Sequence, residues 1–95
     1  MDVRVVYDET CHVDVGELTP DREALIVESL RALRELFEKT NGHPPGAFQV
    51  AQVPLPKFTW QDQNWSITYT VQERKRFGRA ASVVVSFRRV ALKSQ

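Results

Sequence analysis

The basic side chains near the end of the chain have the clearest chemical potential in this sequence. Between Glu73 and Lys93 there are seven Arg or Lys residues and no acidic residue other than Glu73 itself. Guanidinium and ammonium groups bind phosphate oxygens, and aromatic rings beside them can stack on nucleobases. The pattern therefore predicts a nucleic-acid-binding set, and the alternative is a charged turn that simply stays in solvent. The candidate residues are Arg74, Lys75, Arg76, Arg79 and the aromatic Trp60.

The Cys and His residues, by contrast, lack the spacing of a metal site. Cys11, His12, Asp14 and His43 come nearest to one, but they do not match the motifs of tetrahedral metal sites. On an alternating strand, Cys11 and His12 point to opposite faces, which also argues against a Cys–His nucleophile pair. The four glycines are scattered, so the sequence has no phosphate-binding glycine loop. We predict neither a metal nor a cofactor.

The length and composition favour one domain spanning residues 1–95. A single cysteine excludes an intrachain disulfide, which fits a reducing cytoplasm. No apolar run approaches the roughly 20 residues of a membrane span, and the N-terminus lacks the pattern of a signal peptide. We therefore expect a cytoplasmic protein with no membrane partner.

The charges are distributed unevenly along the chain. Residues 1–46 contain five basic and ten acidic residues, whereas residues 47–95 contain eight basic and two acidic residues. Such asymmetry favours a charged partner, and complementary halves could also pair in a homodimer. The alternative is that charges on a folded surface follow the sequence poorly, so that the split has no functional meaning.

A long helix is the element that the local pattern predicts best. Thr19 suits the N-cap and Pro20 the first helical position, and the pattern continues to about Thr40. Gly42 lies in the segment expected to stop the helix. The apolar stripe consists of Ile26, Leu30, Leu33 and Phe37.

Strands are predicted on both sides of this helix. Residues 3–7 and 11–15 alternate between polar and apolar, and they form either a hairpin or one long strand with a polar bulge at residues 8–10. We favour the hairpin. A further strand is predicted over residues 47–53, and residues 57–64 are interpreted as a connection.

The pattern of the last part of the chain predicts a hairpin over residues 65–92. Its two arms are joined by the charged segment 73–79, in which Gly78 reverses the chain. Neither the helix nor the hairpin can bury its apolar face alone. We therefore predict an α+β domain in which one long helix packs on an antiparallel sheet of four or five strands.

Three segments carry a resemblance to a known family. Val3–Asp8 is a short first strand that ends in aromatic and acidic residues, Trp65–Val71 is aromatic-rich, and Val83–Arg89 is Val-rich and ends in basic residues. With the helix between them, these segments resemble the RelE/ParE superfamily of bacterial toxins. The chain departs from the family in having one helix before the sheet instead of two, and Gln49 and Gln52 in place of basic residues on the middle strand.

This resemblance implies a function. Members of the family that cleave mRNA use Lys and Arg on the sheet, and by position Arg88 and Arg89 match them. They would be the catalytic residues, stabilising negative charge on phosphorus. The implied partners are RNA or the ribosome, together with a protein antitoxin, and the implied activity is ribosome-dependent cleavage of mRNA.

A second resemblance leads to a different class of function. A strand followed by one long helix and an antiparallel sheet is similar to the cystatin-like arrangement. Gln49–Val53 is similar to the Gln-x-Val-x-Gly loop of cysteine-protease inhibitors, although it lacks the glycine. Because no acid–base or nucleophile set is apparent, a non-enzymatic inhibitor or adaptor that binds a protein target is the alternative. Whether the chain is an enzyme stays open at this point.

Overall fold

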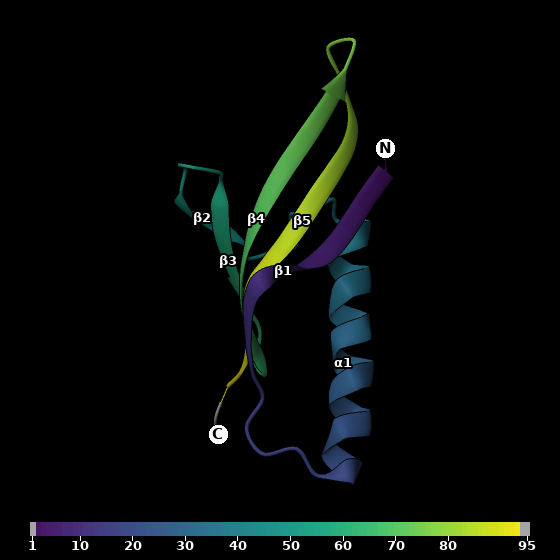
Figure 1. Cartoon of the computed structure of the whole chain (residues 1–95), viewed down its shortest axis with the longest axis vertical. Helices are drawn as coiled ribbons and strands as arrows, with labels where there is room; N and C mark the ends of the chain where they lie inside the picture. The colour runs from purple at the N-terminus through teal and green to yellow at the C-terminus, as the bar shows by residue number, and fades with distance from the viewer. Residues whose placement is uncertain (1, 94–95) are drawn as a thin grey trace.

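The computed structural model describes residues 2–93, and within them the side chains of residues 79–81 are outside the description. One helix and five strands are found in this part of the chain. In chain order they are β1 (Asp2–Asp14), α1 (Pro20–Lys39), β2 (Phe48–Ala51), β3 (Lys57–Gln61), β4 (Trp65–Arg76) and β5 (Arg79–Leu92). The strands form one sheet in the order β1-β5-β4-β3-β2, and α1 lies along one face of it (Figure 1). The predicted α+β class, with a single long helix on a sheet, is confirmed.

The sheet is mixed, so the prediction of a purely antiparallel sheet is wrong in one respect. β1 pairs with β5 in the parallel direction, whereas the other three pairings are antiparallel. Parallel neighbours need a crossover connection, and here α1 is part of the chain between them. β1 and β2 consequently lie at opposite edges of the sheet.

β1 is one long strand, so the favoured hairpin over residues 3–15 is wrong and the alternative with a polar interruption is correct. Tyr7 pairs with Phe87, and the pairing resumes only with His12 opposite Arg89. The polar residues between them absorb this shift in register. Both halves of β1 thus pair with β5, and Val5 is buried opposite Val85.

The segment interpreted as a connection contains a strand, β3. Phe58 lies opposite Tyr69, and Trp60 lies opposite Ile67. These four side chains face α1, where Phe58 stacks on Tyr69 with ring centroids 5.5 Å apart. β2, its partner, is shorter than the predicted strand over residues 47–53.

The helix forms where the sequence predicts it. The Thr19 side chain accepts a hydrogen bond from the backbone N–H of Arg22, and Pro20 occupies the first turn. Leu33 and Phe37 bury their side chains against the sheet. The fully buried centre of the core comprises Val5, Phe37, Ile67, Tyr69, Val85, Phe87 and Val90.

The hairpin of β4 and β5 extends beyond the rest of the domain (Figure 1). Residues 72–78 are all exposed, so this part of the hairpin is an arm in solvent. Its turn consists of Phe77 and Gly78, with φ values of 55° and 77°. Gly78 therefore takes part in the chain reversal, as the sequence predicts.

Candidate functional site

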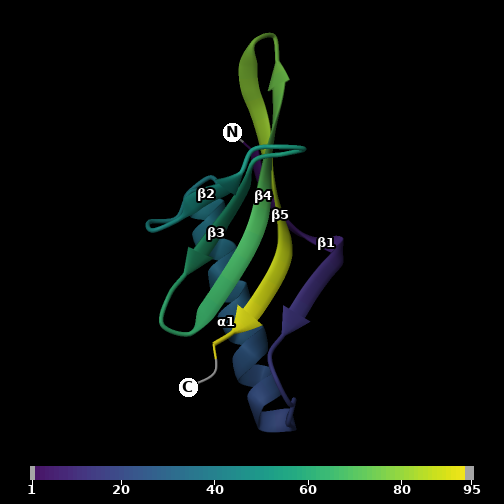
Figure 2. The same ribbon diagram turned by 90° about the vertical axis from the view of Figure 1, so that its left-hand side faces the viewer.

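The sheet face opposite α1, here called the open face, carries mainly hydroxyl and cationic side chains. Figure 2 looks onto this face, with α1 behind the sheet. Strand alternation turns Ile67 and Tyr69 toward the helix and the intervening Thr68 toward the open face. The residues that the pairing places on this face include Lys57, Thr59, Thr68, Thr70, Ser86, Arg88 and Arg89. Such donors are the groups that hold phosphate oxygens.

A β-bulge brings Arg88 and Arg89 together. Tyr69 pairs with Phe87, and the preceding Thr68 pairs with Arg89, so Arg88 is the extra residue of β5. Phe87 and Val90, on either side of the arginines, are both fully buried in the core. The two arginines therefore lie next to each other on the open face, although strict alternation would turn one of them inward.

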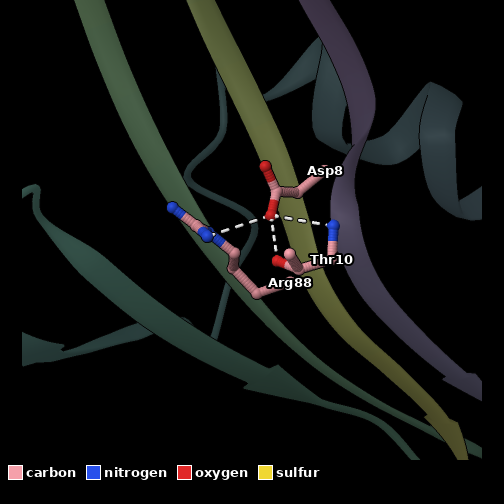
Figure 3. Close-up of polar contacts among 3 residues, drawn as sticks. All are labelled: Asp8, Thr10 and Arg88. Atoms are coloured by element: carbon pink, nitrogen blue, oxygen red, sulfur yellow. Dashed lines mark hydrogen bonds and ion pairs between the residues drawn. The ribbon is translucent and has the colours of Figure 1, made fainter.

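Arg88 is held in place by an acidic residue of β1. Its Nη1 atom lies 3.0 Å from Oδ2 of Asp8, and both side chains are partly exposed, by 39% and 28%. The Asp8 carboxylate also accepts hydrogen bonds from the hydroxyl and the backbone N–H of Thr10 (Figure 3). Asp8 belongs to the segment where β1 loses its register with β5, so the irregularity supplies the partner of Arg88.

These contacts keep Asp8 ionised. The hydrogen bond from the Thr10 hydroxyl is the main cause that lowers the pKa of the Asp8 carboxyl, and the Arg88 guanidinium lowers it further. A carboxylate with a lowered pKa is a weak proton acceptor at neutral pH. Asp8 is therefore suited to orient Arg88 and poorly suited to act as a general base.

Arg88 also lines a small pocket of the open face. The pocket has a volume of about 230 Å³, and Lys57 and Thr70 contribute its other polar side chains. The apolar wall is formed by Val53, Pro54 and Leu55, from the connection between β2 and β3. A guanidinium has five N–H donors, and Asp8 engages only some of them. The pocket thus combines two cations and a hydroxyl, a combination that suits one anionic group.

The cations of the hairpin arm lie farther along the sheet. Arg74, Lys75 and Arg76 are exposed, whereas the side chain of Arg79 is outside the described part of the structure. Arg74 pairs with Ser82, which places it on the same face as Arg88 by strand alternation. Ser82 and Arg88 are six residue steps apart, which correspond to about 20 Å along the strand. The open face therefore carries cations at two places instead of one compact patch.

Trp60 occupies a different position from the other candidates. Only 6% of it is exposed, and its ring packs edge-on against Phe37 with centroids 5.7 Å apart. The indole N–H donates to the carbonyl of Pro45 at 3.0 Å. A ring enclosed in this way offers no face to a nucleobase, so we leave Trp60 out of the proposed interface.

Comparison with protein-family models, characterised proteins and solved structures finds no significant match.

The described residues form neither a metal-ligand cluster nor a membrane-spanning helix. Within residues 2–93, no three His, Cys, Asp or Glu side chains gather as metal ligands would. The helix among the described residues is not long and apolar enough to cross a membrane. Neither result adds a site to the open face.

Sequence reasoning missed three residues of the open face. Lys57 and Thr70 line the pocket with Arg88, and Asp8 orients the guanidinium. Lys57 begins an alternating segment that could have been recognised as a strand, since Phe58 and Trp60 stand at every second position. No local signal identifies Asp8, because its partner lies 80 residues away in the sequence.

Proposed function

We propose that this protein binds RNA and that its open face contacts the phosphate backbone. The observation that carries the proposal is the β-bulge, which sets Arg88 and Arg89 side by side on a sheet face rich in hydroxyl groups. Lys57 adds a third cation beside Arg88. Backbone phosphates are the repeating anions of RNA, and Arg, Lys and hydroxyl side chains are their usual ligands.

The spacing of the cations favours a chain of phosphates over a single one. Arg74 shares the face with Arg88 at a distance of about 20 Å along the strand. One small anion cannot reach both places, whereas a single strand of several nucleotides can. The antiparallel strands also provide a surface on which an extended ligand can lie.

Cleavage of ribosome-bound mRNA, in a toxin–antitoxin pair, is the finer form of this proposal. It rests on the resemblance to RelE/ParE toxins and on the placement of Arg88 and Arg89, which could stabilise negative charge on phosphorus during attack by the 2′-hydroxyl. Asp8 is the acidic group beside Arg88, and its lowered pKa makes it a weak base for this step. Induced expression in bacteria distinguishes binding from cleavage. Growth arrest that requires both arginines supports cleavage, and normal growth excludes it.

Removal of three cations from the open face is the test of RNA binding. We expect Lys57→Gln, Arg88→Gln and Arg89→Gln together to weaken binding to single-stranded RNA by roughly tenfold or more, since phosphate contacts are lost. The slope of log affinity against log salt should fall by about two units, because each single-strand contact contributes about 0.7. Fluorescence anisotropy with a labelled oligoadenylate at several salt concentrations measures both quantities.

A matched control changes the same number of charges on the helix. Arg31→Gln, Arg34→Gln and Lys39→Gln replace exposed cations of α1, on the far side of the sheet from the open face. This variant should bind RNA nearly as the parent does. The proposal fails if the parent binds no RNA, or if the two triple variants lose affinity equally.

Asp8→Asn should strengthen RNA binding, whereas the loss of cations weakens it. The carboxylate neutralises part of the Arg88 charge, so its removal should strengthen RNA binding by about two- to fivefold, the range of a single exposed ion pair. Weaker binding would instead mean that the orientation of Arg88 by Asp8 matters more for RNA binding than the charge that Asp8 neutralises.

Acid unfolding provides a second measurement on the same variant. Because folding lowers the pKa of Asp8, its contribution to stability is present above the ordinary value of 3.8 and is lost as the pH falls through the folded value. Thermal melts between neutral and acid pH should therefore depend less on pH in Asp8→Asn than in the parent.

Binding to a protein is the second candidate function, and the β2 edge favours it. Phe48, Val50 and Val53 are exposed apolar residues in or next to this edge strand. An edge strand can pair with an extended segment of another chain. Nuclease treatment distinguishes the two candidates. A partner that stays bound after nuclease treatment, and that no longer binds the Val50→Lys variant, would favour the protein-binding module.

A further inference from the structure

Phe77 lies at the tip of the hairpin arm, in a position that folding does not explain. The residue is 96% exposed, although large aromatic side chains usually stabilise a protein by being buried. Figures 1 and 2 both show the turn of β4 and β5 far from the helix and the other strands. Its ring therefore contributes nothing to the core.

The backbone of Phe77 makes the choice of residue more unusual. Its φ of 55° and that of Gly78, 77°, are both positive, as a two-residue type I′ turn requires. Asn, Asp and Gly are favoured at the first of these positions, because other residues crowd the following carbonyl in this conformation. Phenylalanine thus adds strain to the turn as well as apolar exposure. A residue that is unfavourable on both counts indicates a role outside folding.

The surroundings of Phe77 indicate what it binds. Arg74, Lys75 and Arg76 precede it on the exposed arm, and the Arg76 guanidinium carbon lies 5.9 Å from the centroid of the Phe77 ring. Glu73 is the one acidic residue near these cations along β4. A flat ring with cations beside it matches the repeating unit of RNA, a base attached to a phosphate-bearing backbone.

We propose that Phe77 stacks on an unpaired base of bound RNA while the cations of the arm contact the neighbouring phosphates. The inference rests on the proposed RNA binding and adds a base-contacting residue to it. The open face then holds the phosphate backbone, and the tip of the arm engages a base some distance along the same strand. Stacking on one ring requires no particular base, so the contact raises affinity without fixing the sequence that is bound.

Phe77→Asn is the decisive variant, because stability and binding should change in opposite directions. Asn-Gly is the favoured sequence for this turn, so the variant should keep the fold and raise Tm by about 4–8 °C through relief of the turn strain. RNA binding should weaken roughly tenfold through loss of the stacked base. The salt slope should stay unchanged, because no phosphate contact is removed. By contrast, replacing Arg74, Lys75, Arg76 and Arg79 with Ser should weaken binding and also lower the slope.

A ligand without bases provides a matched test of stacking. The parent should prefer oligoadenylate to an abasic ribose-phosphate chain of the same length, and Phe77→Asn should lose much of this preference. Phe77→Trp should keep the affinity. Trp60 and Trp65 are buried, so quenching of the exposed indole of that variant on RNA binding would report stacking directly.

Three results would overturn the inference, and each is distinct. If the parent binds no RNA, the proposed function itself fails. If the parent binds RNA and Phe77→Asn binds equally well, with the same preference for bases, the proposed function stands and the stacking role is excluded. If Phe77 is instead required for binding to phosphatidylserine vesicles and not for binding to RNA, the arm is a membrane contact.

Discussion

Phe37→Ala should lower the free energy of unfolding by about 3–5 kcal/mol, the range for removal of a buried aromatic ring. Phe37 has no exposed surface, and its ring stands edge-on to Trp60, Tyr69 and Phe87. The centroid distances are 5.7, 4.9 and 5.0 Å. The ring thereby joins α1 to three different strands. Alanine leaves a cavity among them and removes all three aromatic contacts.

This loss is large for a domain of this size. A chain of 95 residues has a total stability of about 5–14 kcal/mol, so the variant should melt about 12–40 °C below the parent. Urea unfolding followed by circular dichroism measures the change. Phe37→Leu keeps much of the volume and should cost less.

Leu25→Ala is the matched control on the same helix. Leu25 is 69% exposed, so its truncation should change the stability by no more than about 0.5 kcal/mol. If Phe37→Ala lost as little as Leu25→Ala, α1 would not be anchored through Phe37, and the core described above would be incorrect.

Gly42→Ala should cost about 2–5 kcal/mol, for two separate reasons. Gly42 closes α1: its N–H donates to the carbonyl of Phe37 at 2.9 Å, and its φ is +81°. An alanine in this conformation is strained by about 1–2 kcal/mol. Its Cβ would also lie 2.9 Å from Cγ2 of Val85, and overpacking of this kind adds about 1–3 kcal/mol.

The surroundings prevent an easy adjustment at Gly42. The carbonyl of this residue accepts a hydrogen bond from the hydroxyl of Tyr69 at 3.0 Å, so the backbone is held on both sides. Burial raises the pKa of that hydroxyl to about 12, which keeps it a donor over the whole physiological range. A shift of the backbone would weaken this bond as well as the helix cap.

Gly46→Ala separates the two contributions. Gly46 also has a positive φ, +89°, but nothing lies within 4 Å of the position that a Cβ would take. The Gly46→Ala substitution should therefore lower the free energy of unfolding by about 1–2 kcal/mol, from backbone strain alone. Equal losses in the two variants, measured by urea unfolding, would mean that Val85 does not restrict Gly42.

The variants that test RNA binding at the open face and the variants that test the core lie on opposite sides of the same sheet. Residues that face α1 determine whether the domain folds, and residues at alternate positions determine what the open face can bind. Thr70 is the exception, since it lines the pocket and is nevertheless buried. Changes at Lys57 or Arg89, which are exposed, should therefore affect binding with little effect on stability.

The local elements of this protein follow from its sequence. The helix from Pro20 to Lys39 has its cap, its first-turn proline and its apolar stripe within a single segment. The β4–β5 hairpin is likewise local, because its strands are adjacent in the chain and Gly78 supplies the turn. Signals of this type require no information about distant residues, which is why the α+β class could be predicted.

The pairing of distant strands was decided only by the tertiary structure. β1 could have folded back on itself as a hairpin, and the choice of β5 as a parallel neighbour depends on backbone bonds between the two ends of the chain. β3 was missed because its short alternating segment stands between prolines and polar residues, and its assignment depends on the pairing with β4. Local strand propensity does not determine which strands pair with each other.

The candidate site shows the same division. The sequence identifies cations at Arg88 and Arg89, and strict alternation would place them on opposite faces. Only burial of both Phe87 and Val90 in the core forces a bulge, and this bulge puts both arginines on the open face. The pairing of Asp8 with Arg88 depends in turn on β1 lying beside β5. Residue types are thus fixed by the sequence, whereas their convergence depends on packing between segments that are far apart in the chain.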